Sequence, residues 1–196
     1  MLFPKINLFT VILTLLLIVS TTSAQDSGVP DSVIAGNLDG SNIIASPGDI
    51  INIPLWVKND QNAIIMYFPI AIDDQYIADY SDGNLFDILN PSSNPHWDEV
   101  QFTDIFPGYP SVGLTSYPLV GISGIVPPNN WTPFNSDGAW IKLAEFTFEI
   151  SNDPSLIGTT AQIIEGENHI IPGCSFVGVG HEDDYHPRFV GAALSK

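Results

Sequence analysis

The sequence predicts an all-β protein, built as an antiparallel β-sandwich of about nine strands. Three observations support this. Short apolar segments recur along the chain, and the clearest of them alternate between apolar and polar residues. Clusters of Gly, Pro, Asn and Asp separate these segments, in keeping with 16 glycines and 16 prolines in 196 residues. No segment has a clear amphipathic helical pattern, so strands alone must build the core.

The first strand expected is IINIPLWVKN, residues 50–59. Ile51, Ile53, Leu55 and Val57 alternate with polar or bulky residues, which predicts a strand with one buried face. Trp56 should therefore lie on the opposite face from Ile53, Leu55 and Val57. Pro54 has no N–H to donate, so this strand should be an edge strand or carry a bulge.

The other predicted strands follow in order between turn signals. They are AIIMYFPIAI (63–72), EVQFTDI (99–105), SVGLTSY (111–117), LVGISGI (119–125), AWIKLAEFTFEI (139–150), AQIIEG (161–166), SFVGVG (175–180) and RFVGAAL (188–194). The turn signals are SPGD (46–49), KNDQN (58–62), SDGN (81–84), NPSSNP (90–95), FPGYP (106–110), VPPNN (126–130), NSDG (135–138), SNDPS (151–155) and IPGC (171–174). Residues 90–117 are the least regular part.

The N-terminal segment has the pattern of a signal peptide covering residues 1–24. Lys5 precedes an apolar run that is shorter than a membrane span, and the small residues up to Ala24 suit cleavage there. Residues 25–32, QDSGVPDS, should form a flexible leader, and residues 33–196 the folded domain. We therefore expect a secreted protein, extracellular or periplasmic, with no membrane insertion after signal cleavage.

The composition is strongly acidic. The chain has 22 Asp and Glu against five Lys and Arg, a formal net charge of −17. Such a surface repels phosphate backbones, which argues against nucleic-acid binding, and attracts cations such as calcium. Cys174 is the only cysteine, so an intrachain disulfide is impossible, and we expect a small, buried, inert thiol.

Several segments resemble a cohesin-type domain. SPGDIINIPLWVKN (46–59) resembles the family's opening turn and strand, and AIIMYFPIAIDDQYI (63–77) resembles the next strand and its acidic turn. SDGAWIKLAEFTFEI (136–150) and RFVGAAL (188–194) resemble a later Phe-rich strand and the closing strand. The resemblance implies a jelly-roll-like sandwich and a secreted, non-catalytic binding or assembly module. The related cellulose-binding modules share this sandwich, which keeps carbohydrate binding open.

Enzyme signatures are absent from the sequence. GISGI (121–125) lacks the final glycine of a nucleophile elbow, and His181–Glu182 begins a zinc-protease motif whose second histidine comes one residue too late. We therefore expect a protein that is not an enzyme.

The segment HEDDYHP, residues 181–187, is the strongest candidate for a metal site. It carries the candidate ligands His181, Glu182, Asp183, Asp184 and His186. Its strand-like flanks predict a hairpin connection with the two histidines near opposite sides of its neck. A histidine pair suits zinc or copper, and the acids alone suit calcium. We expect a solvated hairpin with no tight transition-metal site; no cofactor is required, and we expect weak calcium binding in preference to zinc binding.

The aromatic residues offer an alternative site. Trp56 should leave the core by alternation, and Trp97, Tyr109 and Trp131 lie in Pro- and Asn-rich segments. Exposed rings of this kind stack on sugars or anchor protein interfaces, whereas loop tryptophans can also fold back over the ends of a sandwich. The leading hypothesis is recognition of an extracellular protein, such as a dockerin, on a sheet face. The alternative is a polysaccharide-binding module using the exposed aromatic residues.

Overall fold

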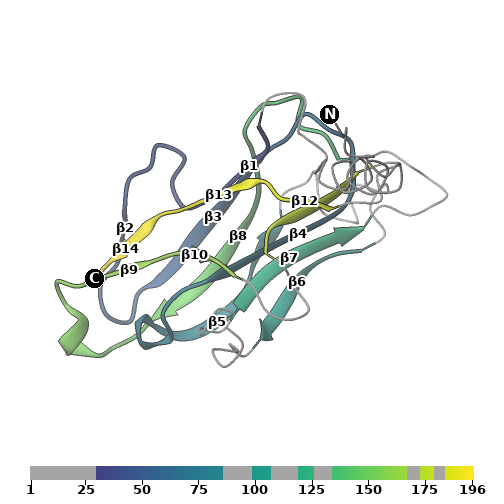
Figure 1. Ribbon diagram of the computed structural model, residues 1–196. Helices are drawn as coiled ribbons and strands as arrows, with labels where there is room; N and C mark the ends of the chain where they lie inside the picture. The colour runs from purple at the N-terminus through teal and green to yellow at the C-terminus, as the bar shows by residue number, and fades with distance from the viewer. Residues whose placement is uncertain (1–29, 86–98, 107–118, 126–133, 167–172, 179–183) are drawn as a thin grey trace, which may run out of the picture.

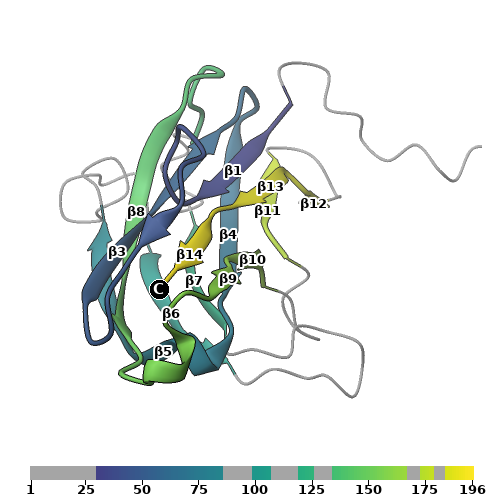
Figure 2. The same ribbon diagram turned by 90° about the vertical axis from the view of Figure 1, so that its left-hand side faces the viewer.

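The computed structural model describes residues 30–85, 99–106, 119–125, 134–166, 173–178 and 184–196. Within these ranges the chain forms strands, with two short 3₁₀ turns, η2 (Asp74–Tyr76) and η4 (Pro154–Leu156). The predicted all-β sandwich is confirmed, and its two main sheets lie in separate layers (Figures 1 and 2). None of the described residues forms a helix long and apolar enough to cross a membrane.

One layer is a five-stranded sheet. Its strands, in spatial order, are β13 (Arg188–Gly191), β1 (Ser32–Ala35), β3 (Ile50–Lys58), β8 (Ile141–Ile150) and β5 (Ile77–Leu85). The neighbouring strands are antiparallel except β13 and β1, which run parallel. The chain therefore closes by laying its C-terminal region beside its first strand.

The second layer contains β12 (Asp184–Tyr185), β11 (Ser175–Gly178), β4 (Ala63–Ala71), β7 (Leu119–Ile125) and β6 (Glu99–Phe106), with β10 (Ile164–Glu165) also paired to β4. A small third sheet joins β2 (Ile43–Ile44), β14 (Ala193–Ser195) and β9 (Thr160–Gln162). It lies at the end of the molecule that holds the C-terminus (Figure 1).

The core lies between the two main sheets and is rich in phenylalanine. Phe68, Phe146 and Phe176 are fully buried. The Phe68 and Phe176 rings meet edge to face at 5.1 Å between centroids, a favoured aromatic geometry. Cys174 is also fully buried, which confirms its expected place in the interior.

The strand around Pro54 confirms the predicted alternation and corrects one alternative. Ile53, Leu55 and Val57 are fully buried, whereas Trp56 is half-buried on the other face. β3 is a central strand, so the edge-strand alternative is wrong. The register shift that follows Leu55 leaves the extra residue, Leu143, on β8, so the bulge lies on the neighbouring strand and not at Pro54. β1 ends at Ala35, opposite Leu55, so no strand residue of β1 faces Pro54 and needs its missing N–H. The Pro54 carbonyl still accepts the N–H of Gly36, the residue that follows β1.

Other differences concern where strands begin and break. SDGN (81–84), predicted as a turn, lies inside β5, where pairing with β8 skips from Ser81 to Asn84 as at a bulge. RFVGAAL divides into β13 and β14, which belong to different sheets, and AQIIEG likewise divides into β9 and β10. β1 begins at Ser32, the last residue of the predicted leader. The segments 1–24 and 111–117 lie outside the described residues.

Candidate binding surfaces

The outer face of the β4–β11 pair carries an apolar strip. Met66, Phe68 and Phe176 point into the core, so their neighbours along the strands point outward. Ile65 lies opposite Val177 across the strand pair; Ile65 is 37% exposed and Val177 is half-buried. Tyr67, also half-buried, continues the same face opposite Ser175. We call Ile65, Tyr67 and Val177 the apolar strip.

The outer face of the other sheet is chemically different. Trp56 lies opposite Lys142 in the register of β3 and β8, and the Lys142 Nζ is 5.8 Å from the centre of the Trp56 ring. The Trp56 Nε1 is buried and has no hydrogen-bond partner among the described residues. Trp56 is thus outside the core, as predicted, but its ring is half-covered and contacts a cation.

A second tryptophan–lysine pair, absent from the candidate sites that the sequence suggested, repeats this arrangement. The Lys58 Nζ lies 5.3 Å from the centre of the Trp140 ring, where Trp140 immediately precedes β8. The signal was in the sequence: WVK (56–58) and WIK (140–142) share a Trp–x–Lys pattern. Antiparallel pairing of two such segments places each tryptophan beside the lysine of the other strand.

A buried polar cross-link holds the ends of these two segments together. The Ser136 Oγ accepts the N–H of Asn59 at 2.8 Å and donates to the Asn59 carbonyl at 2.8 Å. The Asn59 Oδ1 accepts the N–H of Ser136 at 3.0 Å, and the Asn59 Nδ2 donates to the Gln61 carbonyl at 2.6 Å. We call Asn59 and Ser136 the polar cross-link; it directly follows Lys58 and shortly precedes Trp140.

The HEDDYH segment was predicted as the loop of a hairpin between SFVGVG and RFVGAAL; its described residues Asp184 and Tyr185 instead form the strand β12. β11 pairs antiparallel with β12, which places Asp184 opposite Val177. The RFVGAAL segment that follows joins the five-stranded sheet as β13 and the small third sheet as β14. The side chain of Asp184 is not described, and His181, Glu182 and Asp183 lie outside the described residues. No group of three or more His, Cys, Asp and Glu side chains in the described ranges is arranged to hold a metal ion. The calcium and transition-metal expectations for this segment stay predictions.

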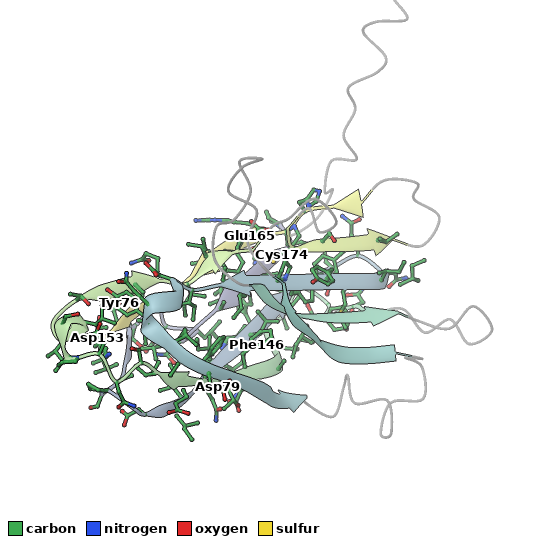
Figure 3. All side chains as sticks on the ribbon, turned by 90° about the horizontal axis from the view of Figure 1, so that it is seen from below. Tyr76, Asp79, Phe146, Asp153, Glu165 and Cys174 are labelled. Atoms are coloured by element: carbon green, nitrogen blue, oxygen red, sulfur yellow. The ribbon has the colours of Figure 1, made fainter. Side chains whose placement is uncertain are left out.

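His186 instead takes part in a junction around Cys174. The His186 Nδ1 donates to the Cys174 carbonyl at 3.0 Å, and the Glu165 carboxylate accepts the Cys174 N–H at 2.6 Å. Figure 3 shows Glu165 and Cys174 side by side. The preceding Gly173 has φ +106°, and a Cβ there would lie 2.8 Å from the Glu165 carboxylate, so this turn requires glycine.

The chemistry of this junction does not favour nucleophilic catalysis by the thiol. Burial, followed by the negative charge of Glu165, raises the pKa of Cys174 well above its ordinary value. A thiol must ionise to act as a nucleophile, and a neighbouring carboxylate opposes that ionisation. The junction therefore fixes the start of β11 and leaves Cys174 in the unreactive form at neutral pH.

The aromatic candidates Trp97, Tyr109 and Trp131 lie outside the described residues, so their part in a sugar-binding surface stays a prediction. Of that predicted set, only Trp56 is placed, beneath Lys142 on the five-stranded sheet.

No protein-family model and no curated protein sequence matches this chain. Its fold is nevertheless similar to that of solved cohesins. One structure, from a type I cohesin–dockerin complex of Clostridium thermocellum, has a TM-score of 0.56 and 15% identity, covering 85% of this chain and 98% of that chain. The sixth cohesin of scaffoldin B from Acetivibrio cellulolyticus, solved with a mutant Cel5 dockerin, has a TM-score of 0.56 and 13% identity, covering 86% and 99%.

The seventh ScaB type I cohesin from Pseudobacteroides cellulosolvens also has a TM-score of 0.56, with 11% identity, and covers 84% of this chain and 90% of that chain. These likenesses confirm the resemblance at the level of fold: the chain has the fold of a cohesin-type domain. At such low identity they carry no residue-level correspondence.

Proposed function

We propose that this chain is a secreted, non-catalytic module that binds another extracellular protein through an outer sheet face. The observation that carries the proposal is the cohesin-type fold, since two of the similar structures were solved with dockerins bound. A dockerin or a similar domain is accordingly the proposed partner.

The apolar strip supports a protein partner. Ile65, Tyr67 and Val177 offer partly exposed aliphatic and aromatic surface on a sheet, and the cores of protein interfaces are enriched in such groups. Polysaccharide binding is the alternative, and it needs planar rings with open faces. The one described ring among its predicted residues, Trp56, is half-buried with a lysine ammonium over it.

A binding experiment tests this choice. The chain is immobilised on a biosensor and exposed separately to the dockerins of the solved complexes and to soluble xylan and cellulose fragments. We expect a dockerin to bind and Ile65→Asp to weaken that binding at least about tenfold, as a central interface residue would. Asn52→Asp, on an exposed position of the other sheet, supplies the same charge change as the matched control and should bind normally.

The opposite pattern would favour the alternative. In that pattern the chain binds xylan or cellulose fragments, Ile65→Asp leaves this binding unchanged, and no dockerin binds. The ligand would then be a polysaccharide and not a protein.

Secretion is tested separately by sequencing the N-terminus of the protein produced by its native host. We expect the chain to be found outside the cytoplasm and to begin near Gln25, because Lys5, the apolar run and the small residues before Gln25 have the three-part pattern of a cleaved signal. Recovery of a chain that still begins at Met1 would contradict cleavage.

A further inference from the structure

The positive charge of this acidic chain is concentrated on one surface. The chain has five Lys and Arg residues, and three of them, Lys58, Lys142 and Arg188, lie on strands of the five-stranded sheet. Of the other two, Lys5 lies outside the described residues. Lys196 lies at the C-terminus, where its ammonium group donates to the carbonyls of Ser151 and Asp153.

The strand register aligns these cations with aromatic and aliphatic side chains. One row crosses the sheet through Val190, Ile34, Trp56 and Lys142, each opposite the next. Residues opposite one another in a sheet project from the same face, and Trp56 defines this face as the outer one. At about 4.8 Å between neighbouring strands, the row spans roughly 14 Å.

A second row lies two residues further along the strands. Ser32 lies between Arg188 on one neighbouring strand and Lys58 on the other. The Lys58 ammonium group in turn lies over the ring of Trp140, which immediately precedes β8. Together the two rows form what we call the cationic face, whose charged and aromatic members are Lys58, Lys142, Arg188, Trp56 and Trp140. Val190 and Ile34 supply its aliphatic part, and Val190 is 40% exposed.

The lysines of this face are positioned before any partner arrives. A cation near an aromatic ring is attracted by the ring's electrons, so the Lys58 and Lys142 side chains sample fewer conformations than lysines that extend into water. Holding a charged group in place reduces the conformational entropy lost on binding. Glu145 also pairs with Lys142, and it offsets part of the positive charge.

We propose that the cationic face is an interaction surface for an acidic patch on a protein partner. Charge complementarity favours a negative ligand here, because the chain as a whole has a formal net charge of −17 and three of its five Lys and Arg residues lie on this sheet. Aromatic and cationic side chains beside aliphatic ones also match the composition of protein interfaces. This surface is separate from the apolar strip, so the proposal does not depend on a dockerin being the partner.

An acidic polysaccharide fits less well for two reasons. Lysine ammonium groups lie over both tryptophan rings, where a sugar would have to stack. A uniformly charged polymer would also extend beyond the row, which spans roughly 14 Å. Its further negative charges would then lie close to acidic side chains of the protein, and at separations below the Debye length of about 8 Å salt does not screen this repulsion. A compact acidic patch can contact Lys58, Lys142 and Arg188 within the span of the row, where Glu145 is the acid paired with Lys142.

The test uses the ¹⁵N-labelled full chain and a short acidic probe, acetyl-GEEEEG-amide, followed by NMR titration. We expect saturable shifts of the Trp56 and Trp140 indole N–H signals, and none with the neutral probe acetyl-GQQQQG-amide. Lys58→Gln and Lys142→Gln should each weaken binding about threefold, the usual size for one exposed ion pair. Lys196→Gln removes the same charge at the other end of the molecule and should bind like the unaltered chain.

Four results would overturn the proposal. The first is that the acidic probe does not bind, and the second is that Lys196→Gln weakens its binding as much as Lys58→Gln does. The third is that tetragalacturonate binds more tightly than the peptide. The fourth is that the chain self-associates in ultracentrifugation and that Lys58→Gln abolishes this association. The third would assign the face to an acidic glycan, and the fourth to a second copy of this chain. Ile65→Asp should leave probe binding unchanged, so the two proposed surfaces succeed or fail independently.

Discussion

The two outer faces of the sandwich carry opposite chemistry on a shared core. The apolar strip on β4 and β11 presents Ile65 and Val177, whereas the cationic face on β3 and β8 presents lysines that contact tryptophans. Both faces are built by the residues that alternate with buried ones, so the core restricts them little. A single sandwich can therefore present two surfaces whose partners differ in charge.

The faces also differ in what holds their strands in register. The polar cross-link of Asn59 and Ser136 ties together the segments that carry Lys58 and Trp140. On the sheet that carries the apolar strip, Glu165 and His186 instead hold the backbone of Cys174 just before β11. Substitutions in these two supports should therefore perturb different faces.

The largest effect should come from breaking the polar cross-link. Asn59→Ala removes the acceptor of the buried Ser136 N–H and a donor to the Gln61 carbonyl. An unpaired buried polar group costs roughly 1–3 kcal/mol, and the lost side chain adds to this, so we expect unfolding free energy to fall by about 2–3 kcal/mol. Urea denaturation measures the loss, with NMR shifts concentrated at Lys58 and Trp140.

The matched control is Asn52→Ala on β3, the strand that Asn59 directly follows. Asn52 is exposed, and its Oδ1 accepts a hydrogen bond from the Thr147 hydroxyl, so its loss should change stability by less than about 0.5 kcal/mol. Equal destabilisation by the two variants would show that the cross-link contributes no more than a surface hydrogen bond.

How much of this fold the sequence could predict depended on local regularity. The segments 50–59 and 119–125 were predicted closely because alternation or a short apolar run between turn signals is a local property. SDGN was mistaken for a turn because a bulge within β5 uses the same residue types as a turn. RFVGAAL was predicted as one strand because nothing local signals that β13 and β14 pair in different sheets.

The binding surfaces were harder to predict, for a topological reason. Alternation placed Trp56 outside the core correctly, yet only the register with β8 brings Lys142 over its ring. WVK and WIK are 84 residues apart in the chain, and sequence alone does not say that they pair. The candidate metal ligands from His181 to His186 were grouped by adjacency in sequence; His186 bonds to the Cys174 carbonyl, and the expectation of a solvated hairpin with no tight transition-metal site stays a prediction.

A smaller effect should appear as a pH dependence of stability that arises from the buried Cys174 thiol. Burial, followed by the negative charge of Glu165, raises the pKa of the Cys174 thiol in the folded chain well above its ordinary value of 9.0. Below that pH the thiol is neutral in both states and stability is unaffected. As pH rises above about 9, the unfolded thiol ionises first, so the folded state loses stability, by about 1 kcal/mol between pH 8 and pH 10.

Urea denaturation at the two pH values checks this, with Cys174→Ala to subtract the titration of other groups. The variant is less stable at both pH values because it leaves a small cavity, but it should lack the Cys174 component of the slope. An identical pH dependence in both proteins would contradict the raised pKa.

The smallest effect should come from the cationic face itself. Lys58→Gln removes a cation–aromatic contact at a half-buried surface position, and such contacts contribute roughly 0.5–1 kcal/mol at exposed sites. Part of this loss is offset, because glutamine keeps much of the aliphatic stem that packs against the Trp140 ring. We therefore expect the unfolding free energy to fall by less than about 0.5 kcal/mol, measured against Lys196→Gln.

A small stability change in Lys58→Gln would separate the role of the polar cross-link, which stabilises the fold, from that of the cationic face, which binds a partner. Lys58 and Asn59 are adjacent in the chain, yet Lys58 is half-buried on the outer face and Asn59 is fully buried. If Lys58→Gln destabilised the fold as much as Asn59→Ala, the lysine would be a structural element and the cationic face would not be free to exchange its contacts for a partner's. A small stability change together with weakened binding of the acidic probe would separate the two roles, because only an interaction surface loses binding without losing the fold.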